Sequence, residues 1–103
     1  MADWTFLTNH AHVLLYIARR PGARLRDVAT AVGITERATQ RIVAELVAGG
    51  YLVPHRLGRR NEYEVHGELP FRHPLEREHE VGELVALFAR AGAAPAQVGD
   101  NGR

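Results

Sequence analysis

Three side chains within five positions carry hydrogen-bonding groups that suit the edges of nucleic-acid bases. They are Arg37, Gln40 and Arg41, and their spacing places them on one face of a helix. An arginine fork can bond both O6 and N7 of guanine, and a glutamine amide can bond N6 and N7 of adenine. The trio therefore predicts direct reading of base edges. The alternative is the ordinary solvated face of an amphipathic helix.

A second set of side chains suits phosphate groups or a narrow minor groove. Arginines near a glycine-containing turn can reach a phosphate backbone, and the N–H groups at the start of a helix attract anions. The candidates are Arg24, Arg26, Thr35, Glu36, Arg56, Arg59 and Arg60. For the arginines of the turn, the alternative is a solubilising loop without a partner.

The charge of the chain is unevenly distributed. All 13 basic side chains are arginine, although the formal net charge is only +1. The span 19–60 holds nine arginines against three acids, a net of +6. The span 61–83 holds two arginines against seven glutamates, a net of −5. A basic half followed by an acidic half is typical of a module that faces DNA, joined to an element that faces solvent or a partner, and the alternative is chance scatter.

Length and composition exclude several classes of protein. A chain of 103 residues supports one compact domain with a modest core. The absence of cysteine excludes disulfides, cysteine zinc sites and a cysteine nucleophile, and the absence of serine excludes a serine triad. There is no glycine-rich phosphate loop, no long apolar run and no secretory signal. We therefore expect a cytoplasmic protein that is not an enzyme, needs no cofactor and does not bind membranes.

The histidines offer little support for a metal site. His10 and His12 are two positions apart on a helix and point to different sides. Glu76 and His79 have the spacing of one helical ligand pair, with Glu83 four positions further on. Because such a pair occurs only once, we expect a solvated face and no metal. A protonation sensor stays open, because histidine titrates near neutral pH.

The elements that would position these side chains follow from apolar periodicity and capping residues. A first helix is expected to begin at Thr8 or Asn9 and to end before Pro21. A second helix ends at Gly33. The third, about 35–48, has Thr35 as its cap and buries the stripe Thr39, Ile42, Val43, Leu46 and Val47.

After the third helix the periodicity changes to that of strands. Residues 51–57 and 62–65 predict a two-stranded hairpin, with a turn at 58–61 and with Pro54 on an edge strand. A connector over 67–74 should lead to a last helix over 75–91, whose apolar face holds Val81, Leu84, Val85, Leu87 and Phe88. Residues 92–103 should form a flexible tail.

The order of these elements resembles the DNA-binding core of a known family. From Leu25 to Leu52 the chain reads LRDVA, VGITERATQRIV and, at the exit of the third helix, GYL. This pattern, followed by an arginine-tipped hairpin, resembles small bacterial winged helix-turn-helix regulators of the MarR-like and ArsR-like type. The resemblance covers roughly residues 8 to 66.

The resemblance implies a fold and a function. The fold is mainly α with a small β-hairpin: a three-helix core and two-stranded wing in residues 1–66, plus a C-terminal helix. The function is sequence-specific binding of double-stranded DNA as a transcriptional regulator. The third helix would enter the major groove, with the wing, 51–65, on the backbone or minor groove.

The resemblance also implies a homodimer formed through the last helix, with Val81, Leu84, Val85, Leu87 and Phe88 at the interface. In that arrangement two recognition helices lie about one DNA turn apart. The alternative is that this helix folds back onto its own core. Two other functions stay open: a protein-interaction module that uses its acidic segment 62–83 without binding DNA, and a sensor for a small-molecule effector of unknown identity.

Overall fold

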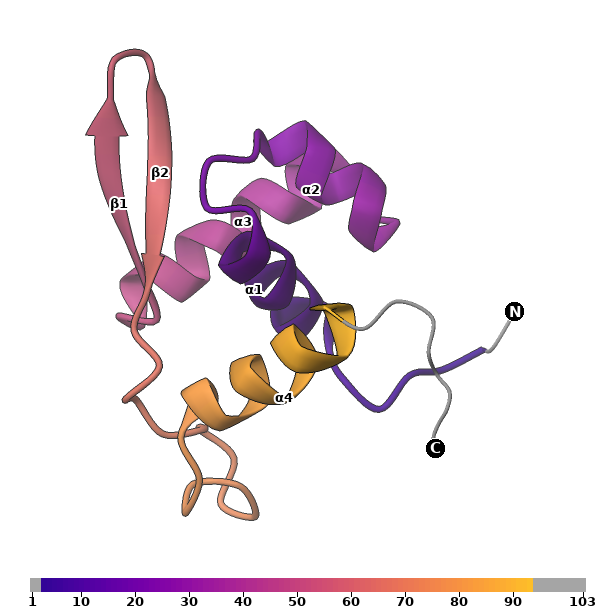
Figure 1. Cartoon of the computed structure of the whole chain (residues 1–103). Coiled ribbons are helices and arrows are strands. Elements are labelled where there is room, and N and C mark those ends of the chain that lie inside the picture. Colours follow the sequence, from indigo (N-terminus) through magenta and orange to yellow (C-terminus); the bar gives the residue numbers. More distant parts are fainter. Residues whose placement is uncertain (1–2, 94–103) are drawn as a thin grey trace. The chain divides into compact units, whose positions relative to one another are not determined.

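The computed structural model describes residues 3–93, and all structural statements below refer to them. The chain divides into two compact units, one ending at His66 and the other beginning at Gly67. The first contains helices α1 (Asn9–Arg19), α2 (Leu25–Val32) and α3 (Glu36–Ala48), followed by strands β1 (Leu52–Leu57) and β2 (Arg60–Val65). The second contains α4 (Val81–Ala93). The mainly α architecture with a hairpin wing is confirmed (Figure 1).

The predicted starts of α1 and α3, and the predicted ends of all three helices, agree with the structure. Thr8 caps α1, its hydroxyl accepting from the N–H of Ala11 at 3.3 Å. Gly33 ends α2 in the left-handed conformation, with φ 89°. This conformation is strained for a residue with a Cβ. It allows the N–H groups of Gly33 and Ile34 to donate hydrogen bonds to Ala29 O.

Helix α3 is fixed at its start by two hydroxyls. The Thr35 hydroxyl accepts from the N–H of Ala38 at 3.0 Å. Thr39 is fully buried and its hydroxyl donates to Thr35 O at 3.0 Å, so this buried polar group is satisfied. The helix ends at Gly49-Gly50, where Gly50 has a φ of 88°.

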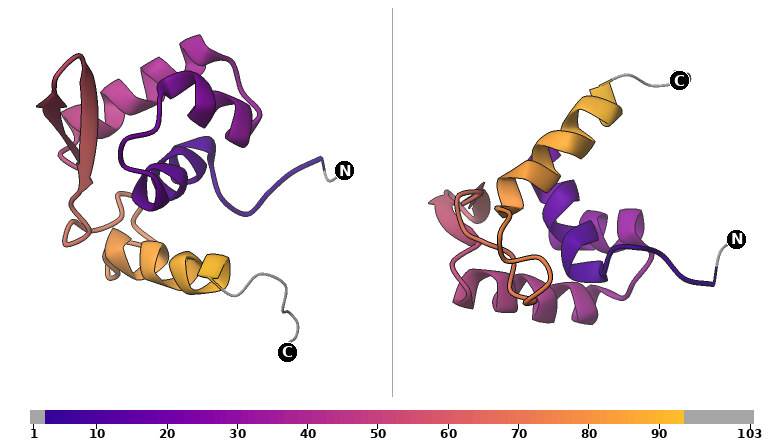
Figure 2. Two further views of the ribbon diagram at one scale, coloured as in Figure 1. Left: turned by 45° about the horizontal axis from the view of Figure 1, so that its top comes forward. Right: turned by 90° about the horizontal axis from the view of Figure 1, so that it is seen from below.

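The core of this unit lies where the three helices meet, since each contacts the other two (Figure 2). Its members are apolar side chains that recur at helical spacing, together with the first residue of β1. Fully buried positions include Val13, Ile17, Val28, Ile42 and Leu52. Val47, expected in the stripe of α3, is half-buried.

The wing is an antiparallel hairpin whose strands pair from Leu52–Val65 to Leu57–Arg60. The turn is therefore Gly58-Arg59, shorter than the expected 58–61, because Arg60 and Asn61 belong to β2. Gly58 has a φ of 63°, a backbone conformation that is strained for a residue with a side chain. Pro54 lies opposite Tyr63, whose N–H is directed away from β1 and donates to Pro21 O at 3.0 Å. This bond ties the wing to the loop between α1 and α2.

The second unit differs from the expectation of a helix over 75–91. Residues 74–78 form turns, and the helix begins only at Val81. The reason is that the side chains from Leu75 to Glu80 are all exposed, so a helix there would have no apolar stripe to bury. The helix continues to Ala93, two residues past its expected end; the rest of the predicted tail lies outside the described residues.

A close backbone crossing precedes α4. The N–H of Gly82 donates to Gly67 O at 2.8 Å, and the N–H of Val81 donates to Leu69 O at 2.9 Å. A Cβ added to Gly67 would lie 2.8 Å from the Cα of Gly82, so this approach requires glycine. Within residues 3–93, no helix is long and apolar enough to cross a membrane.

Candidate nucleic-acid interface

The exposed face of α3 carries the three predicted base-reading side chains. All three side chains, Arg37, Gln40 and Arg41, are exposed. Their sequence neighbours Thr39 and Ile42 are buried. The buried stripe thus fixes the rotation of the helix and turns the polar trio outward. Among the described residues, neither Arg37 nor Gln40 has a side-chain partner, so both present their full set of hydrogen-bonding groups. That they read bases stays a prediction.

The first turn of α3 is exposed at Thr35 and Glu36. Backbone N–H groups in the first turn of a helix lack intrahelical acceptors and attract anions. The Glu36 carboxylate already complements the positive end of this helix. Because a carboxylate repels phosphate, Glu36 can serve a DNA backbone only through its N–H.

The three arginines of the wing differ in their surroundings. Arg59 lies at the exposed turn. The Nε of Arg56 donates to Gly58 O at 2.8 Å, which stabilises the turn and leaves the other guanidinium donors for a ligand. Arg60 is directed toward the loop between α1 and α2, since one of its terminal nitrogens lies 3.2 Å from the position of a Cβ on Gly22.

Arg60 and Arg24 share a hollow between the wing and the start of α2. This hollow is also lined by Gly22, Leu25 and Tyr63. The structure thus brings together an arginine of the wing and the arginine that directly precedes α2, which are far apart in the sequence. Arg26 is exposed on α2 and does not line the hollow.

Histidine–glutamate pairs flank these surfaces. His55 Nε2 lies 2.7 Å from Glu64 Oε1 across the wing, and His66 lies 3.4 Å from the other oxygen of Glu64. The hydrogen bond from His55, aided by the nearby His66, holds the pKa of Glu64 below its usual range. The carboxylate is therefore ionised at neutral pH, and it lowers the positive charge of the wing away from its tip.

A contact that no sequence pattern indicates joins α1 to α3. His10 Nε2 lies 2.6 Å from Glu45 Oε1, and Arg41 Nη1 lies 3.4 Å from both oxygens of Glu45. His10 and Glu45 are 35 positions apart, so no local signal pairs them. His12, in contrast, contacts Asn9 of its own helix at 3.2 Å, and the expectation that the two histidines point to different sides is met.

The five predicted interface residues on α4 are unequally exposed. Val81 is buried, with 5% of its surface exposed, and Leu87 is the most open, at 57%. Leu84, Val85 and Phe88 are half-buried. Their role in a dimer stays a prediction.

The candidate metal pair of Glu76 and His79 is not arranged as a helix would arrange it. Glu76 lies in the turn region, and His79 lies 2.8 Å from Glu83 at the start of α4. Glu83 also accepts from the N–H of Glu80, and these contacts lower its pKa. In the part of the chain that the structure describes, no three histidine or acidic side chains gather as a metal site would need.

Comparisons with known proteins agree with the fold described above. The family model described as MarR family matches residues 5–60. No curated protein matches the chain significantly.

Solved structures of transcriptional regulators have a similar fold. The antimony-specific transcriptional repressor AntR is 22% identical with a TM-score of 0.50, over 81% of this chain and 65% of its own. The regulator PcaV from Streptomyces coelicolor, solved with its natural ligand, is 23% identical with a TM-score of 0.54, over 94% and 67%. The chain thus spans about two thirds of these two proteins.

A third similar structure is a DNA-binding domain. The homodimeric winged helix-turn-helix domain of Mb0332 from Mycobacterium bovis, a possible ArsR-family regulator, is 19% identical with a TM-score of 0.50. The match covers 93% of this chain and 79% of that domain. Since the MarR match covers more than half of the sequence and the fold is that of such regulators, the chain belongs to the MarR family of winged helix transcriptional regulators.

Proposed function

We propose that the chain binds specific sequences of double-stranded DNA as a homodimer in the cytoplasm, with α3 in the major groove and the wing beside it. The observation that carries this proposal is the exposed trio of Arg37, Gln40 and Arg41, mounted on a helix whose opposite face is locked in the core. A major groove about 12 Å wide accepts one α-helix. The arginines of the wing and those at the start of α2 would then hold phosphates on either side.

The homodimer is supported by two observations. The similar domain of Mb0332 is described as homodimeric. Helix α4 carries apolar side chains that are not fully buried, Leu87 most of all. Two-fold symmetry would place two copies of α3 about 34–36 Å apart, and the preferred DNA site would be palindromic with that spacing.

Arg37→Ala is expected to remove discrimination at one base pair of the site. The first step is to select bound duplexes from a random pool, which yields the preferred sequence. Fluorescence anisotropy should then show that Arg37→Ala lowers the preference for that base pair over its alternatives by roughly 5- to 150-fold, or about 1–3 kcal/mol. The loss should be confined to this position, because a guanidinium can satisfy both acceptors of only one guanine.

Arg59→Ala is the matched control for this experiment. It removes the same charge from the turn of the wing, where we expect a phosphate contact. Binding should weaken about equally for every duplex, because phosphates carry no sequence information. If Arg37→Ala binds all duplexes as the unmodified protein does, the assignment of α3 as the reading element is wrong. If no duplex is bound even at low salt, the alternative of a protein-interaction module is favoured.

A further inference from the structure

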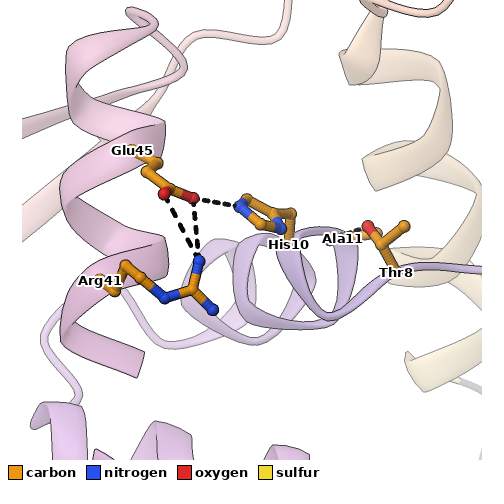
Figure 3. Close-up of polar contacts among 5 residues, drawn as sticks. All are labelled: Thr8, His10, Ala11, Arg41 and Glu45. Atoms are coloured by element: carbon orange, nitrogen blue, oxygen red, sulfur yellow. Dashed lines mark hydrogen bonds and ion pairs between the residues drawn. The ribbon is translucent and has the colours of Figure 1, made fainter. Parts of the chain in front are cut away.

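Three side chains from two helices meet at the edge of the exposed face of α3 (Figure 3). Glu45 stands at the centre of this cluster. One of its oxygens lies 2.6 Å from His10 Nε2 of α1, and both lie 3.4 Å from Arg41 Nη1. Arg41, one of the predicted base readers, is therefore connected to a helix that carries none of the other readers.

The pair of Arg41 and Glu45 is weak by itself. The two side chains are at least half exposed and lie one turn apart, with the arginine nearer the helix N-terminus. This order is less favourable than the reverse, and exposed pairs contribute little because each long side chain loses rotamer freedom. At 3.4 Å the interaction is also long for a charge-assisted hydrogen bond. A further restraint is needed to give Arg41 one orientation.

His10 supplies that restraint. The hydrogen bond from its ring, together with the charge of Arg41, holds the pKa of Glu45 below its usual range, so the carboxylate is ionised at neutral pH. An ionised carboxylate only accepts, and hence His10 Nε2 is the donor. Helix α1 is itself anchored by the buried Val13 and Ile17, so the backbone that carries His10 is held in place. The contact with His10 thus restrains the Glu45 side chain independently of Arg41.

The ion pair leaves Arg41 able to bind a ligand. Only Nη1 is directed to Glu45, whereas a guanidinium has five N–H donors. The donors on Nε and Nη2 remain for the two acceptors on the major-groove edge of a guanine. A guanidinium held in one orientation discriminates better than one that can reorient toward phosphates or other bases, because its geometry is set before binding.

We propose that Glu45, held by His10, is a positioning residue that orients Arg41 and thereby determines specificity at the base pair that Arg41 reads. This inference rests on the proposed function. Glu45 also places a negative charge beside a polyanion, which opposes binding to any sequence. It is one of only three acids in the basic span 19–60. The cluster therefore lowers general affinity and raises discrimination.

The test compares four variants of the full chain by fluorescence anisotropy: Arg41→Ala, Glu45→Ala, His10→Ala and the double variant His10→Ala with Glu45→Ala. Each is titrated with the preferred duplex, with the same duplex changed at the base pair that Arg41→Ala affects, and with a scrambled duplex. Asp27→Asn is the charge control, because it removes one exposed acid from α2. The unfolding temperature of each variant is recorded.

Glu45→Ala is expected to bind the scrambled duplex at least as tightly as the unmodified protein and to show about 1.4- to fivefold lower discrimination, the range for an exposed ion pair. His10→Ala should reduce discrimination by a similar factor, and the double variant should reduce it no further than Glu45→Ala alone. Arg41→Ala should lower both affinity and discrimination. Asp27→Asn should leave discrimination unchanged.

Three results would overturn the inference. If Glu45→Ala keeps full discrimination while Arg41→Ala does not, Glu45 does not position Arg41, although the proposed function stands. If Glu45→Ala weakens binding to all duplexes in parallel with a lower unfolding temperature, its role is only structural. If the unmodified protein binds no duplex, the proposed function fails and the inference fails with it.

Discussion

Ile42→Ala is expected to lower the free energy of unfolding by about 2–5 kcal/mol. Only 2% of the Ile42 surface is exposed, and the side chain lies on the face of α3 opposite the polar trio. Its removal costs the transfer free energy of the deleted methyl and methylene groups and leaves a cavity among the three helices. Because small domains are stable by only about 5–15 kcal/mol, the decrease is a large share of the total. Urea unfolding followed by circular dichroism measures it.

The control for this prediction is Ala48→Gln, an exposed position on the same helix. It should change the unfolding free energy by less than about 0.5 kcal/mol. A midpoint for Ile42→Ala within the error of the control would mean that α3 is not held by this core, and that nothing fixes which of its faces is exposed.

The second large effect concerns salt. The affinity for DNA should fall by about 10³- to 10⁵-fold between 50 and 200 mM salt if a dimer neutralises about six to ten phosphates. The candidates in each chain are the arginines of the wing and Arg24 and Arg26 at the start of α2, all of them exposed. Each neutralised phosphate releases condensed counterions, and concentrated salt opposes that release. Anisotropy titrations over this range give the log–log slope.

A paired variant makes the salt prediction specific to the wing. Replacing both Arg59 and Arg60 by glutamine should make the slope less steep by about 0.9 for each phosphate that the variant no longer neutralises. A slope near zero in the unmodified protein would show that guanidinium–phosphate pairing does not drive binding. An unchanged slope in the paired variant would mean that the phosphates are neutralised by arginines other than Arg59 and Arg60.

The first unit was predictable because its signals are local. A hydroxyl cap at Thr8 or Thr35, a glycine at Gly33 and an apolar stripe each specify one helix end or one helix face without reference to the rest of the chain. The hairpin follows from the change to strand periodicity and from Gly58. The predicted turn is nevertheless two residues too long, because Arg60 and Asn61 are typical loop residues, whereas pairing with β1 includes them in the strand.

The second unit shows the limit of such signals. Pro74, Glu76 and Glu78 are suitable residues for a helix start, and they predict a helix from 75. Residues that favour a helix start are not sufficient here. Leu75 is the only apolar residue between Pro74 and Val81, and isolated short helices are marginal in water. The backbone crossing of Gly67 and Gly82 was not predictable either, because a glycine does not indicate which residue approaches it.

The candidate site likewise combines features that local sequence patterns predict with features that they do not. The exposed trio on α3 follows from helical periodicity, and its exposure is as expected. The contacts of His10 with Glu45, and of Tyr63 with Pro21, join residues far apart in sequence and carry no local pattern. They depend on how the helices, the loop between α1 and α2 and the wing pack together. The roles of individual arginines on DNA depend on a complex, so they stay predictions.

The most direct measurement of the central claim is an ¹H–¹⁵N spectrum of the protein titrated with its preferred duplex. The account predicts that the largest amide shifts occur at residues 35–41 of α3 and at residues 58–60 of the wing, with smaller changes over residues 62–83. Shifts that concentrate in the acidic segment 62–83, or a spectrum that does not change at low salt, would contradict it.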